Sequence, residues 1–203
     1  MKYIAVFASG NGTTSESIMS YFEYSEKVKV ALVVSNKAEA PVLERAKHFR
    51  VETQVVTKEQ LNDEKFVMSL LNYYEIDFIV LAGFLLMIPP YLVNAYDHRM
   101  VNTHPSLLPR HGGKGMYGMR VHEAVKASGD SQTGFTVHYV SNECDGGDII
   151  AKFFADVYPD DTPQDIANRV HKLELENYPW MIDYLLNKDD DKFNFLKPEG
   201  FAM

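Results

Sequence analysis

Short apolar runs alternate with amphipathic stretches through the first half of the chain, and this alternation constrains the fold more than any other feature. The runs at 3–8, 28–34, 51–56 and 77–81 are typical of strands, and the stretches at 15–24, 40–48 and 63–74 are typical of helices. The last of these runs is apolar on both faces, as a central parallel strand is. The pattern predicts an α/β fold: a single open, mostly parallel, Rossmann-like sheet with helices on both faces.

The second half of the chain predicts an antiparallel edge to this sheet. Residues 134–140 and 149–157 alternate in polarity like two antiparallel strands, and a helix is expected at 120–127. Thr162 and the proline after it are typical of a helix start, and that long helix is expected to run to residue 186 with a break near Pro179. The polar run NKDDDK follows, so we predict a domain at 1–188 and a C-terminal tail at 189–203.

Composition excludes several function classes. With 203 residues and 46% hydrophobic residues, the chain can bury one full core, which favours one domain. The net charge of −8 argues against a nucleic-acid or anionic-membrane partner. A single cysteine, Cys144, excludes an internal disulfide framework and fits a reducing cytosol. Without a signal-like or membrane-spanning run, we predict a cytoplasmic protein.

Candidate chemistry is concentrated in the stretch 100–109, MVNTHPSLLP. Asn102 and His104 are two residues apart at a predicted strand end, so both side chains leave from one face. Pro105 and Pro109 hold the following segment out of helix. An amide can donate to a developing oxyanion, and an imidazole can hold or move a proton near neutral pH. Alternatively, the asparagine caps the strand and the histidine satisfies a core carbonyl.

The turn after the first strand, SGNGTT at 9–14, brings backbone N–H groups and hydroxyls to a helix N-terminus. Such a turn can bind a phosphate or carboxylate, although it can also be a plain tight turn. It matches neither the dinucleotide fingerprint nor a Walker loop. Ligands of open α/β sheets bind beyond the carboxyl ends of the strands. We therefore expect Gly12, Gly83 and the Asn102/His104 pair to gather at one edge.

Two glycine-containing connections follow the proline-bracketed segment. The loop at 112–118 carries four glycines and is either a lid or a connection without a role. In the connection 141–148, Asp145 precedes two glycines, which is common turn chemistry. Its carboxylate can also be the acidic partner of a cationic His104. Cys144 has no adjacent base in the sequence and is interpreted as a small core filler.

Together, NTHPSLLP at 102–109, DGG at 145–147 and GNGTT at 10–14 resemble the folate-dependent glycinamide ribonucleotide formyltransferases of purine synthesis, over about residues 1–186. The first string is shared with methionyl-tRNA formyltransferase, formyltetrahydrofolate deformylase and sugar-nucleotide formyltransferases. The tRNA enzyme must hold a polyanion, for which a short acidic chain is poorly suited. The glycine turn, placed for a substrate phosphate, fits the ribonucleotide best.

The resemblance implies roles for individual residues. Asn102, His104 and Asp145 match the catalytic trio. The residues that match the glycinamide ribonucleotide site are Gly12, Thr13, Thr14, Gly83, Pro105 and Glu174. The pterin of the co-substrate 10-formyltetrahydrofolate is expected against Leu81, Leu86, Ile88, Val93, Val140, Ser141 and Asn142. Leu86 stands where many relatives carry a basic residue. No metal is implied, and the protein is expected to be a monomer or a homodimer.

The implied activity is transfer of the formyl group from 10-formyltetrahydrofolate to the amine of glycinamide ribonucleotide, by direct attack of the amine. Another folate-dependent formyltransferase activity stays open as an alternative, and so do two interpretations without transfer. One is hydrolysis of the formyl-folate by the same trio, which would release formate without a ribonucleotide. The other is a non-catalytic folate-binding or nucleotide-binding module, which would bind both ligands without turnover.

Overall fold

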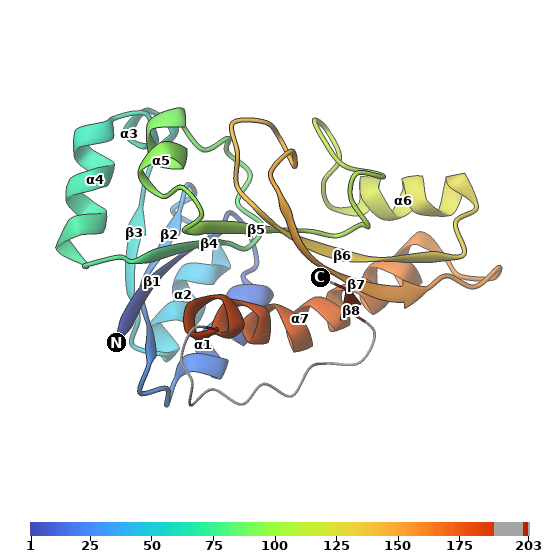
Figure 1. The fold of residues 1–203 in the computed structure, drawn as a ribbon, viewed down its shortest axis with the longest axis horizontal. Helices are drawn as coiled ribbons and strands as arrows, with labels where there is room; N and C mark the ends of the chain where they lie inside the picture. Colours follow the sequence, from blue (N-terminus) through green and yellow to red (C-terminus); the bar gives the residue numbers. More distant parts are fainter. Residues whose placement is uncertain (189–200, 203) are drawn as a thin grey trace.

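A computed structural model describes residues 1–188 and 201–202. Within these residues, eight strands form one sheet in the order β3-β2-β1-β4-β5-β6-β7-β8 (Figure 1). The strands are β1 (Lys2–Phe7), β2 (Val28–Ser35), β3 (Glu52–Val55), β4 (Phe78–Leu81), β5 (Met100–His104), β6 (Gln132–Tyr139), β7 (Ile149–Asp156) and β8 (Phe201–Ala202). The pairs among β1 to β5 are parallel, and those from β5 to β8 are antiparallel. The predicted fold class, with its antiparallel edge, is confirmed.

Helices cover both faces of the sheet (Figure 1). They are α1 (Thr13–Phe22), α2 (Pro41–His48), α3 (Lys58–Leu61), α4 (Glu64–Tyr73), α5 (Pro90–Ala95), α6 (Met119–Ser128) and α7 (Pro163–Asn187). Alternate side chains of β1 explain the two layers, because Ile4 and Val6 pack toward α1, α2 and α7, whereas Ala5 and Phe7 pack toward α4 and α5. The sheet is therefore buried on both faces where its strands are parallel.

The short elements α3, α5 and β8 differ from the sequence prediction. A capping box between Thr57 and Gln60 stabilises the single turn of α3, and a proline occupies the first turn of α5. Of the predicted tail, residues 189–200 and 203 lie outside the described residues, and 201–202 pair with β7. The domain boundary near residue 188 stays a prediction. In the described part of the chain, no helix has the length and apolar character to cross a bilayer.

The expected break in the last helix is wrong, because α7 continues through Pro179. A proline inside a helix has no N–H to donate to the carbonyl four residues earlier, here that of Leu175. The Ser17 hydroxyl on α1 donates to this carbonyl at 2.6 Å. The neighbouring helix therefore supplies the missing hydrogen bond and lets α7 run on without interruption.

Candidate active site

Strand β5 carries the first two predicted catalytic residues, and its neighbour β6 orients one of them. The Asn102 amide nitrogen lies 3.2 Å from Nε2 of His138. Nδ1 of His138 donates to the Tyr139 carbonyl at 2.9 Å, and burial lowers the pKa of this imidazole. The ring is therefore neutral with its proton on Nδ1, so that Nε2 accepts from Asn102. One N–H of the amide is held by this bond, and the other is available to a ligand.

His104 is almost fully buried, and both of its ring nitrogens face acceptors. Nε2 lies 2.8 Å from the carbonyl oxygen of His111 and must carry the proton of that hydrogen bond. Nδ1 lies 3.4 Å from Oδ2 of Asp145. Asp130 accepts from the ring of His111 at 2.8 Å and so fixes the segment whose carbonyl meets His104. Only an imidazolium at His104 can donate to both acceptors.

Asp145 reaches this pair from the loop between β6 and β7. Its backbone is left-handed, with φ of 54°, and a side chain at Gly147 would collide with the Tyr139 carbonyl at 1.8 Å. These two backbone requirements fold the loop back over the end of the sheet. The carboxylate then accepts from the N–H of Gly113 at 2.9 Å and lies 3.8 Å from the ring of His138. The structure thus brings the three predicted catalytic residues together.

The predicted phosphate turn forms one wall of a cavity beyond β1 and β4. Gly12 precedes α1 with φ of 77°, and a Cβ there would lie 2.5 Å from the Val42 side chain, so only glycine fits. The N-terminus of α1 has no side-chain cap, which leaves backbone donors for an anion. The lining residues are Gly10, Asn11, Gly12, Thr13, Thr14, Ala82, Gly83, Thr103, Pro105, Gly118 and Glu174. We call this the substrate cavity, and it contains all six residues predicted for the ribonucleotide.

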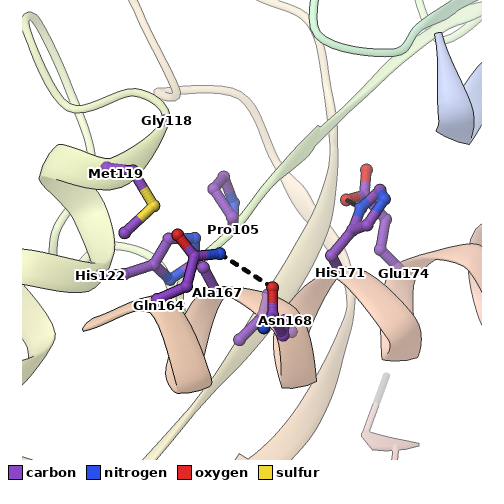
Figure 2. Close-up of a pocket in the computed structure, with 10 residues that line it drawn as sticks. Pro105, Gly118, Met119, His122, Gln164, Ala167, Asn168, His171 and Glu174 are labelled. Carbon is purple, nitrogen blue, oxygen red and sulfur yellow. Dashed lines mark hydrogen bonds and ion pairs between the residues drawn. The ribbon is translucent and has the colours of Figure 1, made fainter. Parts of the chain in front are cut away.

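A second cavity continues the substrate cavity between α6 and α7, and the two share Pro105, Gly118 and Glu174. Figure 2 shows His122 on the α6 side and His171 beside Glu174 on α7. Burial, with a smaller contribution from the nearby His104, lowers the pKa of His122 to about 4, so this ring is neutral near pH 7. The loop at 112–118, for which the sequence leaves open a lid or a connection without a role, ends at this junction of the two cavities.

A third cavity lies on the other side of Asn102 and has largely apolar walls. It is lined by Leu81, Phe84, Leu85, Leu86, Met87, Ile88, Asn102, Val140, Ser141, Glu143, Cys144 and Asp145. We call it the folate cavity, because it contains five of the seven residues expected against the pterin. The other two do not line it: Val93 lies on the buried face of α5, in the core, and Asn142 is exposed.

Sequence reasoning missed part of the site and also misplaced Cys144. Cys144 is an exposed free thiol on the wall of the folate cavity and not a core filler, because the 145–147 turn carries it to the surface. His138 was missed, although a polar residue among the inward-facing positions of a predicted strand is a usable signal. No sequence signal marks the His111 carbonyl or the Gly113 N–H, because both are backbone groups. Among the described side chains, no cluster of three or more His, Cys, Asp or Glu residues could hold a metal.

Comparisons with known proteins agree with this geometry. Residues 2–182 match the family model described as formyl transferase. The phosphoribosylglycinamide formyltransferase of Bacillus subtilis is 36% identical over 191 residues, which cover 92% of this chain and 95% of that protein. A solved structure of phosphoribosylglycinamide formyltransferase from Anaplasma phagocytophilum superposes with a TM-score of 0.84 at 30% identity, covering 98% of this chain and 92% of that one.

Two plant relatives are longer than this chain. The chloroplastic phosphoribosylglycinamide formyltransferase of Arabidopsis thaliana is 39% identical over 186 residues, and the match covers 86% of this chain. The chain spans 63% of the length of that relative and 61% of the Vigna unguiculata protein.

The resemblance seen in the sequence is confirmed by the family model and by these relatives. The chain therefore belongs to the formyl transferase family, among the phosphoribosylglycinamide formyltransferases.

Proposed function

We propose that this protein transfers the formyl group of 10-formyltetrahydrofolate to the amine of glycinamide ribonucleotide, in purine biosynthesis. The observation that carries the proposal is the position of the β5 end between two unlike cavities. Asn102 lines the folate cavity, whereas Thr103 and Pro105 line the substrate cavity. His104 lies between them in sequence and faces Asp145. A formyl donor and an amine acceptor bound in these cavities would meet at the trio.

The substrate cavity offers the groups that a phosphorylated ribose needs. The glycine turn and the N-terminus of α1 supply hydroxyl and N–H donors for the phosphate. Thr13 and Thr14 lie in this turn, and Glu174 faces the same cavity from α7, where its carboxylate can accept from the ribose hydroxyls. On this assignment, Gly83 and Pro105 line the wall between phosphate and amine.

The folate cavity suits a flat, partly apolar ring system with a polar rim. Leu81, Leu86 and Ile88 form apolar wall, and Val140 and Ser141 face them from the loop after β6. We assign the pterin end of 10-formyltetrahydrofolate to this cavity. Leu86 carries no charge, so the acidic tail of the folate gains no salt bridge at this position.

Each residue of the trio has a role in the chemistry. The uncharged glycinamide amine attacks the formyl carbon and produces a tetrahedral oxyanion. The free N–H of Asn102 donates to that oxygen. His104 in its protonated form donates to it once Nε2 leaves the His111 carbonyl, and the Asp145 carboxylate, 3.4 Å from Nδ1, is the counter-charge of that ring. The same carboxylate, through a water, helps to move the amine proton to the folate nitrogen. The bond between the formyl carbon and this nitrogen then breaks, so the oxyanion collapses to the formylated amine and tetrahydrofolate leaves.

A direct assay tests the proposal. Purified protein is mixed with glycinamide ribonucleotide and 10-formyltetrahydrofolate, and the absorbance change of the folate product is followed. We expect turnover that requires both substrates and is lost in Asn102→Ala and His104→Ala, with unchanged circular dichroism. Removal of one oxyanion donor typically costs about 10²- to 10³-fold in rate. Formate release without the ribonucleotide would indicate a hydrolase, and binding without turnover would indicate a binding module. Either result contradicts the proposal.

A further inference from the structure

Three side chains connect the phosphate turn to the last helix. Thr13, the first residue of α1, has its hydroxyl oxygen 3.0 Å from Nε2 of His171 on α7. Nδ1 of the same ring lies 3.7 Å from the Glu174 carboxylate. Thr13 and Glu174 both line the substrate cavity, and His171 lies at the adjoining end of the α6–α7 cavity. The imidazole therefore lies between the residue assigned to the phosphate and the residue assigned to the ribose.

The protonation state of His171 decides which way the Thr13 hydroxyl points. A hydroxyl has one proton to donate. A neutral ring keeps its proton on Nδ1, beside the carboxylate of Glu174, so Nε2 accepts the Thr13 proton and the hydroxyl presents only lone pairs elsewhere. A protonated ring donates from Nε2 to the Thr13 oxygen. The hydroxyl proton is then released to donate to a bound anion.

We propose that His171 is a positioning residue for the substrate phosphate. In its cationic form the ring turns the Thr13 hydroxyl proton into the substrate cavity, and in its neutral form it withdraws that proton. The inference deepens the proposed function and rests on the assignment of the glycine turn to the phosphate. The ligand class whose binding it strengthens is a phosphate monoester. Binding of such an anion and protonation of His171 then favour each other.

The charged surroundings of His171 favour the cationic form of this ring. Glu174, on the same helix, raises the pKa of His171. The adjacent Lys172 points its ammonium toward Glu176, at 3.9 Å. Across the cavity, His122 on α6 stays neutral because burial lowers its pKa to about 4. Thr13, from α1, is uncharged. Among the residues that the structure describes, Glu174 is thus the charged side chain paired with the ring.

Binding of inorganic phosphate, measured by calorimetry between pH 5.5 and 8.5, tests the inference in wild type and in His171→Gln. Glutamine can bond to Thr13 but does not titrate in this range. Comparison at equal pH cancels the ionisation of phosphate itself. We expect the variant to bind about threefold to tenfold more weakly at pH 5.5, a modest effect for a charge-assisted hydrogen bond at a partly exposed site. The two affinities should converge by pH 8.5. A ratio that does not change with pH overturns the inference.

Two further variants identify the route of the effect. In Thr13→Val the hydroxyl is absent, so adding His171→Gln should change phosphate affinity less than the same substitution does in wild type. This difference between the two backgrounds should disappear by pH 8.5. Equal effects in both backgrounds would show that the ring does not act through Thr13. His48→Gln removes an exposed histidine from α2 and should keep the wild-type pH profile.

A measurement on the unmodified chain remains decisive even where a variant fails to fold. Saturating phosphate should raise the midpoint of the His171 ring titration in assigned NMR spectra, and an unchanged midpoint overturns the inference. Failure of the proposed function can be distinguished from failure of the His171 inference. Phosphate that does not bind at any pH contradicts both proposals, whereas formyl transfer with a pH-independent ratio contradicts only the role of His171.

Discussion

Replacement of Asp145 by asparagine separates the charge of the loop carboxylate from its shape. Asparagine keeps an oxygen that can accept from the N–H of Gly113, so the loop can hold its position. What is lost is the ion pair with protonated His104, whose Nδ1 lies 3.4 Å away, and only 5% and 10% of the two side chains are exposed. At an effective dielectric constant of about 20, the Coulombic attraction of such a pair is about 5 kcal/mol, and the cost of burying the two charges offsets part of it. The amide dipole of asparagine keeps some of this attraction, so we expect kcat to fall about 10²- to 10³-fold.

The measurement is steady-state formyl transfer, with the folate product followed by absorbance and with KM determined for both substrates. KM should change little, because the charge acts on the reacting atoms. Asp148→Asn makes the same chemical change at an exposed position of the same loop and should leave the rate as it is. A rate within threefold of wild type for Asp145→Asn, with the fold intact, would refute the assigned role of the carboxylate.

Three other perturbations follow from local geometry. Gly12→Ala places a Cβ 2.5 Å from Val42 at positive φ, so we expect about 2 to 4 kcal/mol of lost stability in urea unfolding and weaker ribonucleotide binding; unchanged stability would contradict the collision. Ser17→Ala leaves the Leu175 carbonyl without its donor beside the helix proline and should cost about 1 to 2 kcal/mol, whereas an intact melting temperature would show that water replaces the hydroxyl. Burial lowers the pKa of His122 from 6.5 to about 4, so its contribution to stability is complete above pH 6.5 and is lost as the pH falls toward 4. Compared with His122→Gln, the wild type should lose about 2 to 3 kcal/mol more between pH 7 and pH 4.5, and equal losses would refute this.

The sequence by itself determined the class of fold and the chemistry-bearing motifs. Period-2 and period-3.6 patterns are local, so the strands, the larger helices and the antiparallel edge could be predicted from them. The short string around Asn102 and His104 and the glycine turn at Gly12 also carry their information locally. At Gly12, the turn needs a residue that tolerates positive φ, and only glycine avoids Val42.

Only the tertiary structure decided which residues come into contact in the site. Asp145 reaches His104 through a left-handed backbone and a glycine pressed against the Tyr139 carbonyl, which no periodicity shows. The neutral ring of His138 orients Asn102 across a pair of strands far apart in sequence. The continuity of α7 depends on a serine hydroxyl from another helix. In each case the deciding contact joins residues distant along the chain, and its strength depends on burial that exists only after the sheet and its two helical layers have formed.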